Sequence, residues 1–592
     1  MSVRKQADSS PTAGRPAEWG SDVVADFLRA TGVPYVALTP GASFRGLHDS
    51  LVNRLGDRDP QMLMCLHEEH AVAVAHGYAK VTGRPLAVAL HSNVGLMHAS
   101  MAIFNAWADR VPVFIIGATG PIDAARRRPW IDWIHTSADQ AALVRSFVKW
   151  DDQPLSVDAT LESLTRAWEI ARTPPHAPTY VVLDVEMQER ALTGPTVVPD
   201  PETAPVSDLP VASEKSVRRA AEALDNAERP VLLMGRVSRE PEDWQRRIRL
   251  AEALGARVIT DLKAGAAFPT EHPAHVPGPA FFLGPQGRDA LAEADVVLSL
   301  DWIDLEGTLR QACSPPRPTV VSASQDVQLH NGWSKDHQAW APVDVALPTT
   351  PDRAVQQLLE ALEVRGREPA TPSPVEPSPA GRPTSDGRIT MTELARVLRT
   401  TSADSDVCLV RLPLGWDGDD WQFAHPLDYL GYDGGAGIGS GPGMLVGAAL
   451  ALKDSGRLAV AVLGDGDYLM GVQALWTAAH YEIPLLAVVA NNRSYFNDEL
   501  HQERVAFTRD RDTSRRWVGQ RIDDPAPDLA AMARAQGLEG IGPVTDVEDL
   551  SGALEQGVLA VRAGRSTVVD VLVEPGYSPA MSAGTVGGQA GS

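Results

Sequence analysis

Cysteine is scarce in this sequence: its 592 residues include only three, Cys65, Cys313 and Cys408, which lie far apart and in no metal-ligand spacing. The sequence therefore argues against a disulfide framework and favours a reducing compartment. No apolar run approaches the roughly 18 to 20 residues needed to span a bilayer. The polar first residues, 1–18, lack the apolar segment of a signal peptide. We expect a soluble, cytoplasmic protein with no membrane partner.

Basic residues are also in deficit, with 53 Lys and Arg against 76 Asp and Glu, which gives a net charge of −23. A general electrostatic attraction to nucleic acid is not expected at that charge. A local arginine cluster could still hold an anionic small molecule in one cleft. The remaining composition, 44% hydrophobic and 22% charged, is that of an ordinary globular protein.

The chain is too long for one hydrophobic core, so we expect several domains. Short runs rich in Val, Ile and Leu alternate with amphipathic stretches, which is typical of α/β domains with mostly parallel sheets flanked by helices. Two proline-rich segments predict linkers between three such domains. The predicted parts are a disordered tail at 1–17, domains at 18–190, 211–364 and 388–576, linkers at 191–210 and 365–387, and a second tail at 577–592.

The most specific motif lies in the third domain. Gly464-Asp465-Gly466 follows the apolar run 458–463, and after 24 intervening residues Asn491-Asn492 follows a second apolar run, 485–490. Both motifs should therefore lie at the carboxyl ends of strands, where open α/β sheets bind ligands. A carboxylate and an amide oxygen suit a hard cation shared with phosphate oxygens. A helix expected to begin near Met470 would direct N–H groups toward the same anion.

This pair of motifs is the thiamine-diphosphate motif, and the chain resembles the family that includes benzoylformate decarboxylase, pyruvate decarboxylase and the large subunit of acetolactate synthase. The resemblance covers nearly all of the folded chain and implies a pyrimidine-binding, a central and a diphosphate-binding domain. It implies that Mg²⁺ is bound by Asp465, Asn492 and the backbone oxygen of Ser494. It also implies that thiamine diphosphate is held by these residues together with Gly464, Gly466 and Asp467.

A glycine-dense segment, 434–443, precedes a predicted helix, but it lacks the GxGxxG spacing and no strand comes directly before it. Members of the family place a bulky apolar residue here, beneath the bent cofactor. The resemblance gives that role to Ile438. A buried isoleucine in a glycine-rich turn is the alternative.

The first domain contains His67-Glu68-Glu69, with Glu68 nine residues before Gly77-Tyr78-Ala79. A glutamate that begins a helix of small residues is ordinarily a capping or solvated residue. The resemblance implies instead that Glu68 activates the cofactor: a buried carboxylic acid beside the aminopyrimidine stabilises the imino tautomer, whose nitrogen takes the thiazolium C2 proton. Glu69 is expected to be a solvated or salt-bridged neighbour.

His91 follows the predicted strand 85–90 directly. An imidazole at a strand end can relay protons, because its pKa is ordinarily near neutrality. The sequence pattern Leu-His-Ser-x-x-Gly around His91 resembles that of benzoylformate decarboxylase, and the resemblance implies a catalytic role for His91. A structural histidine is the alternative.

Three departures from the decarboxylase pattern bear on the substrate. Pro40-Gly41-Ala42-Ser43 replaces a Pro-Gly-Ser, so either Ser43 has taken over the contact with the substrate carboxylate or that contact is lost. The family asparagine seven positions after His91 is His98 here, and residues 301–310 contain no histidine. Gly41 and His98 are predicted to line the cofactor site.

Two arginine-rich segments, at 126–128 and 504–516, lie beside aromatic residues on presumed loops. They could bind a carboxylate or a larger anion, or pair with their own acids. In acetolactate synthase the central domain binds FAD, but the stretch after Leu300, Asp301-Trp302-Ile303-Asp304, lacks the expected acid-and-arginine pattern, so FAD is not expected here.

The resemblance implies non-oxidative decarboxylation of a 2-oxo acid through an ylide and an enamine. A carboligase that joins the enamine to an acceptor aldehyde or ketone shares every residue up to that point. A protein that keeps the fold for binding or regulation is a remote alternative. In this family the activating glutamate and the metal site usually meet across a subunit interface, which implies a homodimer or homotetramer.

Overall fold

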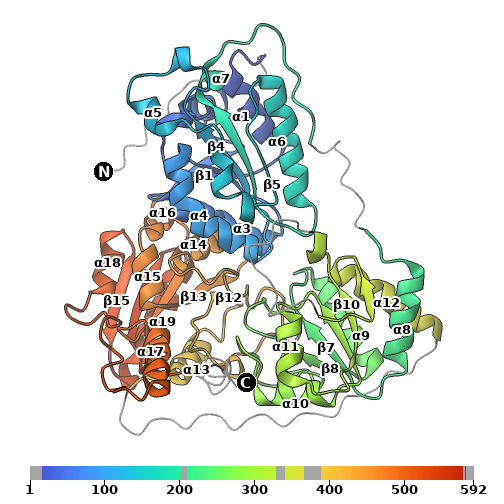
Figure 1. The fold of residues 1–592 in the computed structure, drawn as a ribbon. Coiled ribbons are helices and arrows are strands. Elements are labelled where there is room, and N and C mark those ends of the chain that lie inside the picture. Colours follow the sequence, from blue (N-terminus) through green and yellow to red (C-terminus); the bar gives the residue numbers. More distant parts are fainter. Residues whose placement is uncertain (1–15, 202–209, 329–340, 366–387, 578–580, 582–592) are drawn as a thin grey trace. The chain divides into compact units, whose positions relative to one another are not determined.

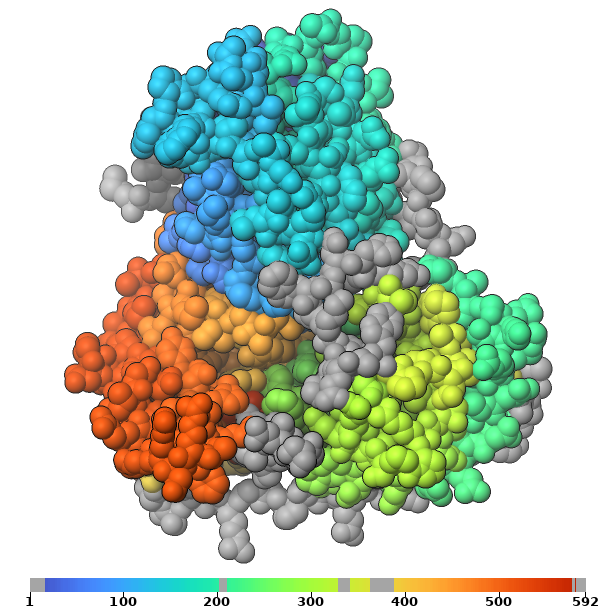
Figure 2. Space-filling model, viewed as in Figure 1, coloured from blue at the N-terminus to red at the C-terminus, as the bar shows by residue number. Residues whose placement is uncertain are grey.

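The computed structural model describes residues 16–201, 210–328, 341–365, 388–577 and Met581 (Figure 1). The chain divides into two compact units, the first comprising Met1–Ala79 with Arg84–Ser207 and the second comprising Lys80–Gly83 with Asp208–Ser592. Within each unit, side chains fill the space between the helices and strands (Figure 2). No described helix has the length and apolar character needed to cross a membrane.

The first unit is built on one parallel sheet of six strands in the order β2-β1-β3-β4-β6-β5. Its strands are β1 (Tyr35–Leu38), β2 (Gln61–Met64), β3 (Ala87–Ala89), β4 (Phe114–Thr119), β5 (Trp150–Asp152) and β6 (Thr179–Asp184). Its helices are α1 (Gly20–Ala30), α2 (Arg45–Asp49), α3 (Glu68–Thr82), α4 (Ser92–Ala108), α5 (Ile131–His135), α6 (Val157–Arg172) and α7 (Val185–Glu189).

Central strands of this sheet are mostly apolar because helices cover both faces. Every residue of β4 and β6 is buried. On one face, Phe27 of α1 and Trp168 of α6 pack on Phe114 of β4, with ring centroids 6.3 and 5.5 Å away. In the same sheet β1 and β3 are neighbours, and the segments that carry Gly41 and His91 begin at their carboxyl ends.

The second unit contains two parallel sheets of five strands, in the orders β11-β10-β9-β7-β8 and β12-β13-β14-β16-β15. Around the first sheet lie α8 (Glu214–Asp225), α9 (Pro241–Leu254), α10 (Pro285–Glu293), α11 (Leu305–Ala312) and α12 (Pro351–Arg365). The strands of that sheet are β7 (Pro230–Met234), β8 (Arg257–Ile259), β9 (Val296–Leu300), β10 (Thr319–Ala323) and β11 (Val345–Leu347).

The second sheet of this unit carries the metal motif. Its strands are β12 (Val407–Arg411), β13 (Leu458–Gly464), β14 (Leu486–Asn491), β15 (Glu539–Val544) and β16 (Thr567–Leu572). Its helices are α13 (Met391–Thr401), α14 (Gly441–Leu452), α15 (Asp465–Gly471), α16 (Ala474–His480), α17 (Phe496–Thr508), α18 (Leu529–Ala535) and α19 (Val547–Arg562). Single 3₁₀ or π turns occur at Ala42–Phe44, Ser50–Arg54, Ala124–Arg126, Gln140–Leu143, Arg145–Phe147, Asp326–Gln328 and Gly418–Asp420.

The predicted fold class is confirmed: all strand pairs in the three sheets are parallel, and helices flank the sheets. Each sheet is formed by one of the three predicted domains. The exact domain boundaries stay a prediction, since 202–209, 366–387 and most of both tails fall outside the described residues.

Two local predictions are wrong. The helix expected near Met470 begins at Asp465, because Gly464 takes an extended N-cap conformation and two acids, Asp465 and Asp467, fill the first turn, where the helix dipole favours them. Arg504 was expected on a loop but lies on α17, which continues to Thr508 and also has two acids in its first turn.

Candidate active site

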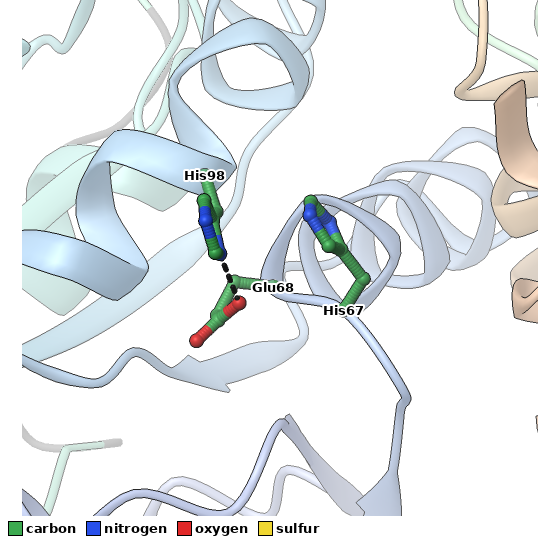
Figure 3. A group of neighbouring side chains, drawn as sticks. All are labelled: His67, Glu68 and His98. Carbon is green, nitrogen blue, oxygen red and sulfur yellow. Dashed lines mark hydrogen bonds and ion pairs between the residues drawn. The ribbon is translucent and has the colours of Figure 1, made fainter.

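Glu68 is the first residue of α3, where the helix dipole favours a carboxylate. Its side chain is 9% exposed, and Oε2 lies 2.9 Å from Nδ1 of His98, whose imidazole is 58% exposed (Figure 3). The buried carboxyl is therefore joined to a solvent-facing imidazole on the neighbouring helix, α4.

A second imidazole completes this cluster. The ring of His67 stacks on that of His98, with centroids 4.7 Å apart and planes 18° apart. Nδ1 of His67 accepts a hydrogen bond from the backbone N–H of Glu69. Glu69, expected to be solvated or salt-bridged, is half-buried. Burial, and then the nearby His98, lowers the pKa of His67.

The cluster of His67, Glu68 and His98 has one ligand atom from each residue within 4.8 Å of the others. Two imidazoles and one carboxylate would suit zinc or a similar transition metal, whereas Mg²⁺ prefers an all-oxygen shell. The cluster is therefore not a magnesium site.

Gly95 brings α4 close to this carboxyl. A Cβ at Gly95 would lie 3.1 Å from Oε1 of Glu68 and 3.2 Å from Cβ of His91, so any side chain would crowd both residues. No hydrogen bond joins Oε1 of Glu68 to another described residue. One carboxyl oxygen is thus held by His98, and the other lies against Gly95.

His91 is the N-cap of α4 and is held by Ser43. The Ser43 hydroxyl accepts the backbone N–H of Ser92 at 3.0 Å and lies 2.8 Å from Nδ1 of His91. The hydroxyl can donate to Nδ1 in one tautomer of His91 and accept from Nδ1–H in the other, and we consider the first. A neutral His91 then carries its proton on Nε2.

The surroundings of His91 disfavour its protonated form. Burial, followed by the nearby His135, lowers the pKa of His91, and the two rings lie 4.8 Å apart. Both possibilities raised for Ser43 stay open: it contacts the substrate carboxylate, or that contact is lost. A Cβ at Gly41 would lie 2.5 Å from Cβ of His91, so glycine is required there for the imidazole to pack. Contact between Gly41 and the cofactor stays a prediction.

The metal motif lies in the second unit, where β13 and β14 pair with Gly464 opposite Ala490. Oδ1 of Asp465 accepts the N–H of Gly466 at 3.0 Å. Oδ2 of Asp465 and Oδ1 of Asn492 both accept the N–H of Ser494, at 3.1 and 2.9 Å. Two oxygen ligands from neighbouring strand ends are therefore gathered at the backbone of Ser494.

Asp465 is a buried carboxylate with no cationic partner among the described residues. Burial, only partly offset by backbone N–H donors, raises its pKa to about 6. An Mg²⁺ ion would supply the missing positive charge, and the amide oxygen of Asn492 and the carbonyl oxygen of Ser494 are the further ligands it prefers. The residues present therefore fit the expected metal.

The loop after β14 is fixed by a residue that the motif does not include. The hydroxyl of Ser494 donates to Oε1 of buried Glu499 at 2.6 Å. Arg516 and Arg521 each lie 3.3 Å from the same carboxylate. The hydroxyl of Ser494 is therefore engaged with Glu499, and the role of the Ser494 carbonyl as a metal ligand stays a prediction. Sequence reasoning missed the role of Glu499, since a glutamate in the first turn of a helix carries no distinctive signal.

Asp467 has its carboxylate engaged within the protein. Oδ1 accepts the N–H groups of Gly439 and Gly441 at 2.6 and 3.2 Å, and Oδ2 lies 2.6 Å from Nε of Arg411. Nη1 of Arg411 also lies 2.7 Å from Oδ2 of Asp433. Oδ1 of Asp433 accepts the backbone N–H of Ala436. Burial alone would lower the pKa of Arg411, but the two nearby carboxylates outweigh it and raise that pKa above its ordinary value.

This buried network holds the glycine-rich segment that carries Ile438. Gly439 has a φ of +103°, which requires glycine. Ile438 is only half-buried, so its side chain is not simply part of the core, as the alternative interpretation required. Asp467 supports this segment, and its predicted contact with the cofactor stays a prediction.

The two glycines of the motif differ. A Cβ at Gly466 would lie 2.7 Å from the ring of Tyr495, whereas a Cβ at Gly464 would meet nothing within 4 Å. Gly466 therefore permits close packing of the two strand-end loops, and Gly464 borders open space in which a phosphate could approach the backbone.

One arginine in each arginine-rich segment pairs with a nearby acid. Arg128 pairs with Asp132 at 2.9 Å, and Arg516 pairs with Glu499. A cavity of about 170 Å³ lies beside the first sheet of the second unit, lined among others by Asp261, Lys263 and Trp302. None of the predicted site residues lines it.

Comparison with known proteins agrees with these features. Family models match the thiamine pyrophosphate enzyme N-terminal binding domain at residues 18–143, the central domain at 217–326 and the C-terminal binding domain at 416–571. Benzoylformate decarboxylase of Pseudomonas aeruginosa is 25% identical, over 87% of this chain and 93% of that protein. Acetolactate synthase of Bacillus subtilis is 22% identical, over 94% of this chain and 93% of that protein.

A solved structure shares the fold. The thiamine diphosphate-dependent 4-hydroxybenzoylformate decarboxylase of Rhodococcus jostii superposes with a TM-score of 0.76 at 21% identity, covering 95% of this chain and all of that one. The three family models together match more than half of the sequence and include both cofactor-binding domains. The chain belongs to the thiamine pyrophosphate enzyme family.

Proposed function

We propose that the protein catalyses the non-oxidative decarboxylation of a 2-oxo acid, with thiamine diphosphate and Mg²⁺ as cofactors. The observation that carries this proposal is the packing of Glu68 and His91 on Gly95: a Cβ at Gly95 would lie 3.1 Å from Oε1 of Glu68 and 3.2 Å from Cβ of His91, so an imidazole that can donate a proton lies beside this carboxyl. A decarboxylase needs such a donor, because the carbon that loses CO₂ must be protonated before an aldehyde can leave.

Binding of the cofactor would be the task of the second unit. Asp465, Asn492 and the carbonyl of Ser494 would hold Mg²⁺, and the metal would anchor the diphosphate. Ile438 would support the cofactor from the segment held by Asp467. When bound, thiamine diphosphate supplies a nucleophilic carbon and an electron sink for the loss of CO₂.

Proton transfer would be the task of the first unit. Glu68 would share a proton with the aminopyrimidine ring through the oxygen that His98 leaves free. His91 would orient its Nε2–H toward the reacting carbon. Because its pKa is lowered, a protonated His91 is a stronger acid than an ordinary imidazolium.

A carboligase is the second candidate, favoured by the match to acetolactate synthase over 94% of the chain. In that reaction the decarboxylated fragment is joined to an acceptor aldehyde or ketone instead of being protonated. Glu68 and the metal ligands would act in the same way. A purely binding or regulatory protein has no need to retain Glu68, Asp465 and Asn492 together, and we do not favour it.

The experiment that separates the candidates is isotope-traced CO₂ release from a panel of 2-oxo acids, with both cofactors present, with and without added aldehydes. A decarboxylase releases CO₂ from one class of acid and accumulates the matching aldehyde. Release that requires an acceptor identifies a carboligase. If no 2-oxo acid releases CO₂ under either condition, both candidates are wrong. The oligomer, proposed as a homodimer or homotetramer, is measured on the same sample by light scattering.

A further inference from the structure

The metal turn, residues 492–494, holds a backbone conformation that its sequence does not favour. Arg493 has a φ of +55°, in the left-handed region that residues with a Cβ rarely adopt. Such a conformation persists only where neighbouring contacts fix it. Because Asn492 and Ser494 are both predicted metal ligands, the contacts that fix this turn also set the geometry of the metal site.

The segment that follows α17 pairs with the metal turn through its backbone. The N–H of Ile522 donates to the carbonyl of Arg493 at 2.8 Å. Ser494 and Arg521 lie opposite each other in the same short antiparallel bridge. The residues just before and after Arg521 are thus held against the turn, although they lie almost 30 residues further along the chain.

Glu499 joins the metal turn to this segment through its side chain, which is 2% exposed. Oε1 of Glu499 accepts the hydroxyl proton of Ser494 at 2.6 Å. Nε of Arg521 lies 3.3 Å from Oε1, and Nε of Arg516 lies 3.3 Å from Oε2. A buried carboxylate needs cations close to it, and both cations come from the segment that follows α17.

Ser494 is fixed by two of its three polar groups. Its N–H donates to Oδ2 of Asp465 and to Oδ1 of Asn492, and its hydroxyl donates to Glu499. Among the residues that the structure describes, none donates a hydrogen bond to the Ser494 carbonyl. The carbonyl oxygen therefore stays available, and the other two groups fix its direction.

We infer that Glu499 is a positioning residue for the metal: through the Ser494 hydroxyl it holds the metal turn in the conformation that binds Mg²⁺. Arg516 and Arg521 in turn hold the Glu499 carboxylate in place. This inference rests on the proposed function, because it takes the turn as part of the metal site. Glu499 acts through Ser494 and touches neither the metal nor the substrate. Arg516, from the arginine-rich segment 504–516, then serves the metal site and not an external anion.

The test measures the affinity for Mn²⁺, which prefers the same oxygen ligands as Mg²⁺, by electron paramagnetic resonance of the free ion. Excess thiamine diphosphate is present, and no substrate is added. Glu499→Gln keeps the size of the side chain but removes the charge that both arginines require. We expect it to bind Mn²⁺ about tenfold to a hundredfold more weakly than the wild type. Glu503→Gln is the matched control and should bind with wild-type affinity, because Glu503 also pairs with Arg516 but has no described hydrogen bond to Ser494.

Ser494→Ala separates positioning from a general structural loss, because it removes the hydroxyl and keeps the backbone carbonyl. It should lose Mn²⁺ affinity as Glu499→Gln does, and the double variant should lose no more than the weaker-binding single variant, since both changes act through one bond. The inference is overturned if Ser494→Ala binds Mn²⁺ with wild-type affinity, if Glu499→Gln binds it like Glu503→Gln, or if the two losses add in the double variant.

Asp465→Asn tests the proposed function separately. It changes a predicted metal ligand directly, so it should weaken Mn²⁺ binding under the same conditions. If Asp465→Asn binds Mn²⁺ with wild-type affinity, the proposed metal site is wrong whatever the Glu499 variants do. If it binds weakly while Glu499→Gln and Ser494→Ala bind like the wild type, the metal site stands and only the role of Glu499 is wrong.

Discussion

The candidate site residues of the first unit and those of the second unit are held by different kinds of contact. In the first unit, the residues around Glu68 and His91 are titratable side chains joined by single hydrogen bonds, such as Ser43 to His91 and His98 to Glu68. In the second unit, Asp465 and Asp467 accept backbone N–H groups and organise loops at strand ends. The first arrangement suits groups that must gain and lose protons, and the second suits a rigid cradle for a metal and a diphosphate.

The comparison implies that substitutions in the two units should impair different properties of the protein. A change in the first unit should slow the reaction and leave cofactor binding intact. A change in the second unit should weaken the cofactor or the fold. The predictions that follow test this division.

The largest effect is expected for Glu68→Gln. Glutamine keeps the shape of the side chain but cannot share a proton, so activity should fall by about 10²- to 10⁴-fold, the range for loss of a general acid or base. Steady-state turnover at saturating cofactor measures it. Glu69→Gln, one residue along α3, is the control and should stay near wild type. Equal losses in both variants would contradict the assignment of Glu68.

Arg411→Met should lower the free energy of unfolding. It leaves the carboxylates of Asp433 and Asp467 buried without their cation, and breaking such a pair costs about 3 to 5 kcal/mol. The shift of the urea midpoint measures the loss, and Arg396→Met, at an exposed position on α13, is the control. Similar midpoints for the two variants would show that the network does not stabilise the glycine-rich segment.

Ser43→Ala should have a smaller effect, confined to the reaction. It removes one neutral hydrogen bond to His91, worth about 0.5 to 1.5 kcal/mol, so turnover should fall by up to about tenfold. The pH profile of turnover should also change, because the ring proton of His91 is no longer fixed on Nε2. Ser43→Thr keeps the hydroxyl and should restore both. A variant with unchanged turnover and pH profile would remove His91 from the mechanism.

Much of the metal motif around Asp465 and Asn492 could be predicted from the sequence. Apolar runs ending at Gly464 and Ala490 predicted two adjacent strand ends, and the structure confirms the strands. The grouping of Asp465 and Asn492 follows from parallel pairing alone. The start of α15 was misplaced because a Gly-Asp-Gly turn gives no apolar periodicity from which the first turn of a helix can be predicted.

The contacts that hold the site could not be predicted in the same way. Ser43 and His91 are 48 residues apart and meet only because β1 and β3 are neighbours in the sheet. Arg411 ends an apolar strand, and its sequence neighbours do not reveal its two acid partners, one from a loop (Asp433) and one from the first turn of α15 (Asp467). Such contacts depend on three-dimensional packing and leave no local pattern.

The central claim is that the second unit binds the cofactor and the first unit moves protons. Calorimetric titration of thiamine diphosphate in the presence of Mg²⁺, performed on Glu68→Gln and Asp465→Asn together with their turnover, tests it most directly. We predict that Glu68→Gln binds within about threefold of wild type and is nearly inactive, whereas Asp465→Asn loses about tenfold to a hundredfold in affinity because a metal ligand is weakened. Wild-type affinity in Asp465→Asn, or a comparable loss of affinity in Glu68→Gln, would contradict the account.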